Sequence, residues 1–265
     1  MTLKKLNHYI RSISYLNSRK FFNFLLAEFS FRVHSTMFDR FRRPLFISVE
    51  PADFCQLRCP QCPVGMAARN KGTCIDEKLV FDTIAALRKS LLHVIFYFQG
   101  EPLLNPHLAE YVRFAHEAGI YTSTSTNAML LNSENARKLV ESGLDKLIVS
   151  VDGVTQEVYE QYRKGGKLER ALEGIRFVQE WKQRLGSRTP FVEMQFIVFG
   201  TNEHQIGEVK RLAKSSGADS LTLKTAQIYD FENPNPLHTS LSRYSRYRKQ
   251  SDGSYVLKNP LKNRC

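Results

Sequence analysis

The stretch Glu50-Pro-Ala-Asp-Phe-Cys-Gln-Leu-Arg-Cys-Pro-Gln-Cys-Pro63 follows directly after the apolar run Leu45-Phe-Ile-Ser-Val49. It places Cys55, Cys59 and Cys62 in a C-x3-C-x2-C spacing. Three thiols this close together, on a loop that follows a predicted strand, can converge on one metal centre. A closed zinc site or an ordinary four-iron cluster takes four protein ligands, so a set of three leaves one coordination position open. The spacing therefore predicts a metal centre with room for a further ligand.

Outward from this loop, short β-branched and aromatic runs alternate with segments of helical apolar spacing. We predict six strands, at residues 45–50, 94–99, 120–124, 146–151, 192–199 and 220–224. Helices are predicted between them, at residues 77–89, 107–118, 133–142, 168–185 and 203–215. Strict alternation indicates an α/β fold with a parallel sheet and right-handed crossovers. The spacing leaves no room for eight units, so we expect a six-unit partial barrel or an open doubly wound sheet. In both, functional loops gather at the carboxyl ends of the strands.

Charge divides the 265 residues into a nearly neutral centre and two basic ends, with +12 in total. Residues 1–43 hold nine Lys or Arg against Glu28 and Asp39, for a net +7. Residues 240–265 hold seven against Asp252, for a net +6. From these boundaries we expect a basic, helical, amphipathic N-terminal extension at 1–43, a core domain at 44–230 and an irregular basic C-terminal tail at 231–265.

The basic ends are compatible with nucleic acid, an anionic membrane surface, an acidic partner, or simply with solubility. The apolar stretch 21–31 is too short and too interrupted to span a bilayer. We expect it to form an amphipathic helix packed on the main domain, in preference to a helix lying on a membrane surface. No signal-peptide pattern follows Lys4 and Lys5. The five cysteines do not form a secreted disulfide framework, which favours a reducing cytoplasm.

Two further motifs follow predicted strands, and together with the cysteines they resemble the radical S-adenosylmethionine (SAM) superfamily. Gly100-Glu101-Pro102 follows the second strand, with Gln99 where that family has a first glycine. Ser150-Val-Asp152-Gly153 follows the fourth strand. The resemblance covers about residues 44–230 and implies a partial (β/α)6 TIM-like barrel. It points to the branch that usually carries a cysteine-rich SPASM extension, whose first cysteine would fall near Cys265, so the chain resembles a catalytic core ending before that extension.

The resemblance implies a cofactor pair and a reaction. In that family three thiolates hold a [4Fe–4S] cluster, and the fourth iron binds the amino and carboxylate groups of SAM, so Cys55, Cys59 and Cys62 would be the metal ligands. With an electron from an external one-electron reductant, the cluster cleaves SAM to methionine and a 5′-deoxyadenosyl radical. That radical abstracts hydrogen from the substrate, here an unidentified peptide or small molecule.

The resemblance also suggests SAM contacts at the strand ends, namely at Gln99, Gly100, Glu101, Pro102, Asn127, Ser150 and Asp152. Each motif has a structural alternative. Gly-Glu-Pro can be a turn after a strand, Asn127 can form an Asx turn, and Asp152 can cap the following helix. Arg163 could pair with a ligand carboxylate, although a solvated surface arginine is expected. Gln61 stands where the family usually has an aromatic residue before the third cysteine.

Two alternative functions remain open from the sequence. The first is a zinc-stabilised α/β protein whose basic ends bind nucleic acid. It requires a fourth zinc ligand, for which neither His93 nor His107 is a convincing partner, and the aromatic residues follow core periodicity rather than a stacking platform. The second is a truncated member of the family that binds the cluster and SAM without turnover.

Overall fold

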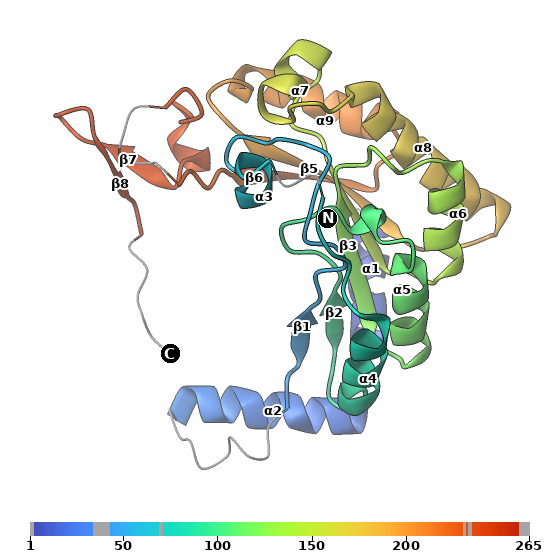
Figure 1. The fold of residues 1–265 in the computed structure, drawn as a ribbon. Helices are drawn as coiled ribbons and strands as arrows, with labels where there is room; N and C mark the ends of the chain where they lie inside the picture. Colours follow the sequence, from blue (N-terminus) through green and yellow to red (C-terminus); the bar gives the residue numbers. More distant parts are fainter. Residues whose placement is uncertain (1–2, 34–42, 69–70, 230–231, 233–234, 260–265) are drawn as a thin grey trace.

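Six strands form one parallel sheet in the computed structural model, which describes residues 3–33, 43–68, 71–229, 232 and 235–259 (Figure 1). The strands are β1 (Phe46–Ser48), β2 (His93–Ile95), β3 (Tyr121–Thr126), β4 (Lys146–Ser150), β5 (Phe191–Val198) and β6 (Ser220–Thr225). Each strand pairs with the next one along the chain, in the order β1-β2-β3-β4-β5-β6. A doubly wound sheet reverses its strand order at a switch point. The uninterrupted order excludes that alternative and gives the partial barrel.

Helices occupy the connections between strands and cover the outer face of the curved sheet (Figure 1). They are α3 (Pro63–Met66), α4 (Glu77–Leu87), α5 (Leu108–Glu117), α6 (Ser133–Glu141), α7 (Gln156–Tyr162), α8 (Leu168–Arg184) and α9 (Ile206–Ser215), with 3-10 turns η2 (Pro102–Leu104) and η3 (Glu203–Gln205). Side-chain caps start several of them; for example, Asp76 accepts a hydrogen bond from Leu79 N at the start of α4. The five predicted helices are all present, and α3 and α7 were not predicted.

The main hydrophobic core lies between the sheet and these helices. It contains strand residues such as Val94, Leu147, Val149 and Phe196, all fully buried. A second, smaller cluster lies beneath the cysteine loop and joins Leu57, Tyr162, Phe199, Ile228 and Tyr247. Because it draws on segments far apart in the sequence, this second cluster fixes the cysteine loop relative to the last strand and the tail.

Two regions differ from the sequence-based expectation. Strand β2 ends at Ile95, and the predicted continuation to residue 99 instead turns away as a loop at the carboxyl end of the sheet. The C-terminal region, expected to be irregular, contains the 3-10 turn η4 (Ser242–Tyr244) and an antiparallel hairpin of β7 (Tyr247–Lys249) and β8 (Tyr255–Leu257). The hydroxyl of Tyr247 donates to Ile228 O, which holds the hairpin on the barrel. Cys265 lies outside the described residues.

The N-terminal region forms two helices, α1 (Leu3–Ser14) and α2 (Ser18–Val33), at the amino end of the sheet. The expectation that stretch 21–31 packs its apolar side on the main domain is wrong. The buried residues of α2 are Lys20, Asn23 and Ser30, and its phenylalanines face outward. Among the described residues, no helix is long and apolar enough to cross a membrane.

Candidate metal and cofactor site

A cavity of about 410 Å³ opens at the carboxyl ends of the strands. This volume falls in the range of about 300–1,000 Å³ that is typical of small-molecule sites. The three cysteines line it, together with residues from the loops and ends of five strands, among them Gln99, Gly100, Glu101, Asn127, Ser150, Gln195 and Lys224. The parallel sheet therefore brings the predicted motifs to one place, as the carboxyl-end rule requires.

A larger cavity of about 860 Å³ lies at the opposite end of the sheet, between α1 and the end of α8. Two of its cationic groups already have carboxylate partners, since Arg11 pairs with Asp145 and Lys182 with Asp219. None of the motif residues lines it. The chemistry-bearing residues of this chain gather instead in the smaller cavity beside the cysteines.

The cysteine loop is held by close backbone contacts. Cys62 N donates to Cys59 O, and Pro63 then starts the short helix α3 at a position where a missing N–H costs nothing. A Cβ on Gly65 would lie only 2.5 Å from Cys59 O, so only glycine allows α3 to pack on the loop. Arg58 N donates to Lys164 O and ties the loop to the end of α7.

Burial sets the electrostatics of the thiols. It raises the pKa of Cys55 to about 11 and also raises the pKa of Cys59. Opposing this, the N–H of Leu57 and the side-chain amide of Asn127 each lie 3.4 Å from Cys55 Sγ. Such donors stabilise a thiolate, and a bound metal deprotonates its thiols outright. Burial thus favours the protonated form of Cys55 and Cys59, while the donors beside Cys55 favour its thiolate once a metal binds.

Gly100 and Glu101 lock the loop after β2 against its neighbours. A Cβ on Gly100 would lie 1.9 Å from Ala52 O, so the glycine is required by the backbone of the cysteine loop. The buried Glu101 carboxylate accepts from Thr126 Oγ1 at 2.6 Å and from Asn127 N at 2.8 Å. Burial raises the pKa of Glu101, while these donors oppose the rise. Glu101 thus joins the loop after β2 to the end of β3.

Asn127 connects this network to the metal-ligand candidates. Its side-chain amide nitrogen faces Cys55, and its Oδ1 accepts from Gln56 Nε2 at 3.1 Å and from Met129 N at 3.0 Å. The contact with Met129 N is the Asx turn that the sequence left as an alternative. The same side chain therefore forms a turn and positions an N–H toward a thiol.

Asp152 and Arg163 form a buried ion pair under the cavity. Arg163 Nε donates to Asp152 Oδ2 at 2.6 Å, and Arg163 Nη1 lies 4.0 Å from Cys59 Sγ. Asp152 raises the pKa of Arg163, against the effect of burial. The expectation of a solvated Arg163 is wrong, because its side chain is only 14% exposed. Asp152 does not cap α7; Thr155 does.

The predicted SAM-contact residues divide into two groups. Gln99, Gly100, Glu101, Asn127 and Ser150 line the cavity. Pro102 and Asp152 do not line it, since Pro102 is the buried first residue of η2 and Asp152 lies beneath Arg163. The Glu101 carboxylate is engaged with backbone and side-chain donors from η2 and β3.

Two residues at the site were missed by the sequence argument. Glu50 Oε1 accepts from the backbone N–H groups of Gln99 and Gly100, at 2.7 and 2.8 Å. Its place at the carboxyl end of the first predicted strand was a signal that could have identified it. Arg246, from the tail, also lines the cavity, and no local pattern indicated that the tail folds back to this point.

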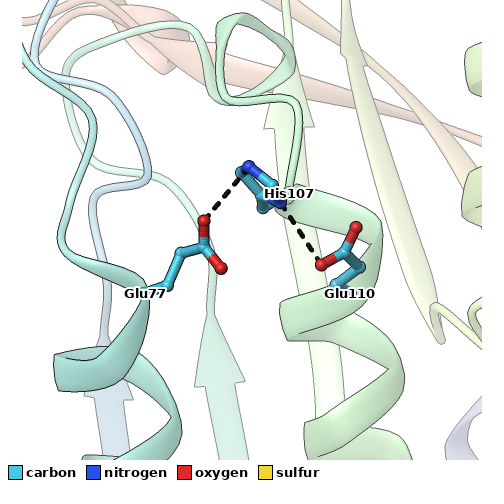
Figure 2. A group of neighbouring side chains, drawn as sticks. All are labelled: Glu77, His107 and Glu110. Atoms are coloured by element: carbon cyan, nitrogen blue, oxygen red, sulfur yellow. Dashed lines mark hydrogen bonds and ion pairs between the residues drawn. The ribbon is translucent and has the colours of Figure 1, made fainter.

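A second group of metal-ligand side chains lies elsewhere (Figure 2). Among the described residues, Glu77, His107 and Glu110 are the only three Cys, His, Asp or Glu whose ligand atoms all lie within 4.8 Å of one another. Glu77 Oε1 is 3.1 Å from His107 Nε2, and Glu110 Oε2 is 3.3 Å from Nδ1. Both ring nitrogens thus face carboxylates. This surface cluster joins α4 to α5.

Among the described residues, the three thiols line the cavity but no histidine does. A closed zinc site takes four protein ligands. A four-iron cluster instead distributes its thiolates over different irons. His107 is committed to the surface cluster, and His93 Nε2 is bound to Ser123 Oγ near the amino end of the sheet. Neither histidine lines the cavity, so the donor set fits an iron–sulfur cluster with one open iron.

Comparison with known proteins identifies the class. The sequence profile of the Radical SAM superfamily matches residues 49–213, so the chain belongs to this superfamily. Its members bind a [4Fe–4S] cluster and SAM and include enzymes such as PqqA peptide cyclase and GTP 3′,8-cyclase. The expectations of family, of an enzyme family and of its cofactors are confirmed.

The chain is similar to several individual members of this superfamily. The chain is 30% identical to the AdoMet-dependent heme synthase of Methanosarcina barkeri over 66% of this chain and 48% of that protein. It is 27% identical to the PqqA peptide cyclase of Bradyrhizobium diazoefficiens over 72% of this chain and 49% of that protein. The fold is similar to that of Streptococcus suis SuiB bound to S-adenosylmethionine, with a TM-score of 0.60 and 15% identity over 74% of this chain and 44% of SuiB. The chain spans about half the length of the curated relatives it matches.

Proposed function

We propose that this chain is the catalytic core of a radical SAM enzyme in which Cys55, Cys59 and Cys62 hold the [4Fe–4S] cluster. The observation that carries the proposal is the donor set of the cavity, which offers three thiols and, among the described residues, no further cysteine and no histidine. N–H groups of Leu57 and Asn127 face one of these thiols and compensate for the negative charge of a thiolate.

The chain's own residues would bind and orient SAM on the open iron. Gln99, Gly100, Asn127 and Ser150 line the cavity beside the cysteines and would make direct contacts. We assign positioning roles to the other three predicted residues. Glu101 fixes Asn127 by accepting its N–H, Pro102 starts the turn that supports this loop, and Asp152 holds Arg163 near Cys59.

When bound, the reduced cluster would supply one electron that breaks a carbon–sulfur bond of SAM, giving methionine and a 5′-deoxyadenosyl radical that would abstract hydrogen from the substrate. The electron comes from an external one-electron reductant, and a reducing cytoplasm suits the exposed iron. The protein excludes water from the floor of the cavity, where Leu57, Tyr162 and Phe199 pack under the cysteine loop.

The substrate end of the cavity is cationic. Lys224 and Arg246 line its mouth, and no ion pair to either is found among the described residues. Glu101, whose carboxylate lines the cavity, is buried and accepts a hydrogen bond from Thr126 Oγ1. We infer a peptide or small-molecule substrate that carries an anionic group. A peptide is supported by relatives named PqqA peptide cyclase and by SuiB, which was solved with its precursor peptide SuiA.

The test is anaerobic reconstitution with iron and sulfide, followed by dithionite reduction in the presence of SAM. We expect cluster absorbance and formation of 5′-deoxyadenosine. Cys59→Ala should abolish both. Cys74→Ala is the matched control, since Cys74 is exposed and does not line the cavity, and it should leave both unchanged.

Three results would contradict the proposal. A purified protein that carries zinc and takes up no iron would restore the zinc alternative. A loaded cluster without SAM cleavage would identify a binding protein without turnover. Equal losses in Cys59→Ala and Cys74→Ala would show that the effect is general rather than specific to the cavity.

A further inference from the structure

Helix α2 is attached to the barrel by polar residues rather than by apolar ones. Its buried positions, Lys20, Asn23 and Ser30, are spaced so that they fall on one narrow stripe of a helix. Lys20 Nζ donates to Gly119 O, in the turn before β3, and the Asn23 amide pairs with both the N–H and the carbonyl of Arg43. These bonds fix which side of α2 faces the protein.

Most of the large apolar side chains of α2 face outward. Phe21, Phe22, Phe24, Leu25 and Val33 are all exposed. Figure 1 shows α2 lying across the end of the molecule near the start of β1, away from the cysteine loop. An exposed row of large apolar side chains on one element marks an interaction surface rather than ordinary surface variation.

Helix α1 also turns its polar side toward the barrel and its apolar side outward. Leu6, Ile10 and Ile13, which share one helix face, are exposed. The opposite face holds the barrel, since Arg11 Nε donates to Asp145 Oδ1 at 2.9 Å and His8 Nε2 lies 3.0 Å from Tyr121 Oη. Two successive helices therefore turn polar side chains toward the barrel and present apolar ones to solvent.

The net charge of the N-terminal region indicates which kind of partner this apolar surface would bind. Residues 1–43 carry a net charge of +7, while the centre of the chain is nearly neutral. A second copy of the chain would bring an equally cationic surface against this one, which like-charge repulsion opposes. A bilayer that contains anionic lipid offers both the apolar interior and the complementary charge that basic, phenylalanine-rich interfacial helices use.

We propose that α1 and α2 form a membrane-binding surface that lies on an anionic bilayer without crossing it. The exposed phenylalanines of α2 enter the boundary between headgroups and acyl chains, and the net positive charge of residues 1–43 attracts the anionic headgroups. The mouth of the cysteine cavity, at the carboxyl end of the sheet, then faces away from the lipid. This inference stands independently of the proposed catalytic function.

The experiment is co-sedimentation of the full 265-residue chain with phosphatidylcholine vesicles that contain about 30 mol% phosphatidylglycerol. We expect binding to these vesicles and little binding to pure phosphatidylcholine. Raising the salt from about 0.15 M to about 1 M shortens the screening length and should weaken binding. Phe21→Ser with Phe22→Ser should reduce the partition coefficient at least about tenfold, because serine has similar helix propensity but no apolar side chain to bury.

The matched control is Leu79→Ser with Leu185→Ser. These residues are 57% and 46% exposed, close to the 63% and 47% of Phe22 and Phe21, but lie outside α1 and α2. The control should bind vesicles as the wild type does. Thermal unfolding of both double variants by circular dichroism checks that each is folded.

Several outcomes would overturn the proposal. These are a wild-type chain that stays in the supernatant, equal binding to both vesicle types, or equal loss of binding in the two double variants. Light scattering adds a further one: a wild-type dimer that the Phe21/Phe22 variant dissociates, with no vesicle binding, would assign the face to self-association.

Discussion

Arg163 and Asp152 form an ion pair that is buried directly beneath the cysteine loop. The 2.6 Å contact between Nε and Oδ2 uses the last turn of α7 and the loop after β4. The guanidinium also reaches Cys59, while Asp152 Oδ1 accepts from Ile197 N. One ion pair thus connects the cysteine loop, β4, β5 and α7.

Removing the cation should destabilise the fold strongly. Arg163→Met leaves the Asp152 carboxylate buried and unpaired, which costs about 3–5 kcal/mol of unfolding free energy. Urea unfolding of the purified protein measures the loss. Arg170→Met, at an exposed position of α8, is the control and should change stability by less than about 0.5 kcal/mol. Similar stabilities for the two variants would show that Asp152 finds other donors.

The loop after β2 should tolerate no side chain at Gly100. Gly100→Ala forces a methyl group against Ala52 O, and we expect a loss of about 3 kcal/mol, at the upper end of overpacking costs. Gly207→Ala is the matched control, because Gly207 lies in α9 with open space around it. That control should stabilise the protein by about 0.5–1 kcal/mol. Comparable melting temperatures for both variants would contradict the close approach.

Asn127 should tune the reduction potential of the proposed cluster. Asn127→Ala removes the N–H that faces Cys55 Sγ, and such donors stabilise the more negative, reduced form. We therefore expect a more negative potential in a redox titration followed by electron paramagnetic resonance. Asn132→Ala removes only the cap of α6, so it should cost about 1 kcal/mol of stability without moving the potential. A potential unchanged in Asn127→Ala would separate this residue from the cluster.

His93 should make stability depend on pH. Burial lowers the pKa of His93 to about 4, below its ordinary value of 6.5, so the folded state binds this proton less tightly than the unfolded chain. The stabilisation is complete above pH 6.5 and is lost as pH falls toward 4, by roughly 3 kcal/mol in all. Urea unfolding from pH 7 to pH 4 should show a shallower slope for His93→Gln than for the wild type. The exposed His204→Gln should retain the wild-type slope.

The barrel and the metal-ligand candidates could be predicted because both depend on local pattern. Alternating strand and helix periods gave the number of units, and C-x3-C-x2-C follows from spacing alone. Arg163 could not be placed in this way, since its burial depends on contact between α7 and a loop about a hundred positions earlier. The chain-local pattern around Arg163 is indistinguishable from that of a surface turn.

The prediction of how α2 is oriented failed for a different reason. Periodicity assigns an inner face when apolar residues gather on one side of a helix, but nine of the thirteen positions from Phe21 to Val33 are apolar. Two polar residues, Lys20 and Asn23, fix the orientation through bonds to Gly119 and Arg43, and those partners are set by tertiary structure. The C-terminal hairpin was missed because short strands stabilised by distant contacts carry little pattern of their own.

The buried carboxylate of Asp145 connects the N-terminal region to the barrel. This fully buried carboxylate receives hydrogen bonds from Arg11 Nε, Tyr15 Oη and Thr122 N, and two of these donors come from the N-terminal region. Trimming the chain to residues 49–213, the part that matches the superfamily, would remove two of the hydrogen-bond donors of this carboxylate. We therefore expect the trimmed chain to unfold more readily than the whole one.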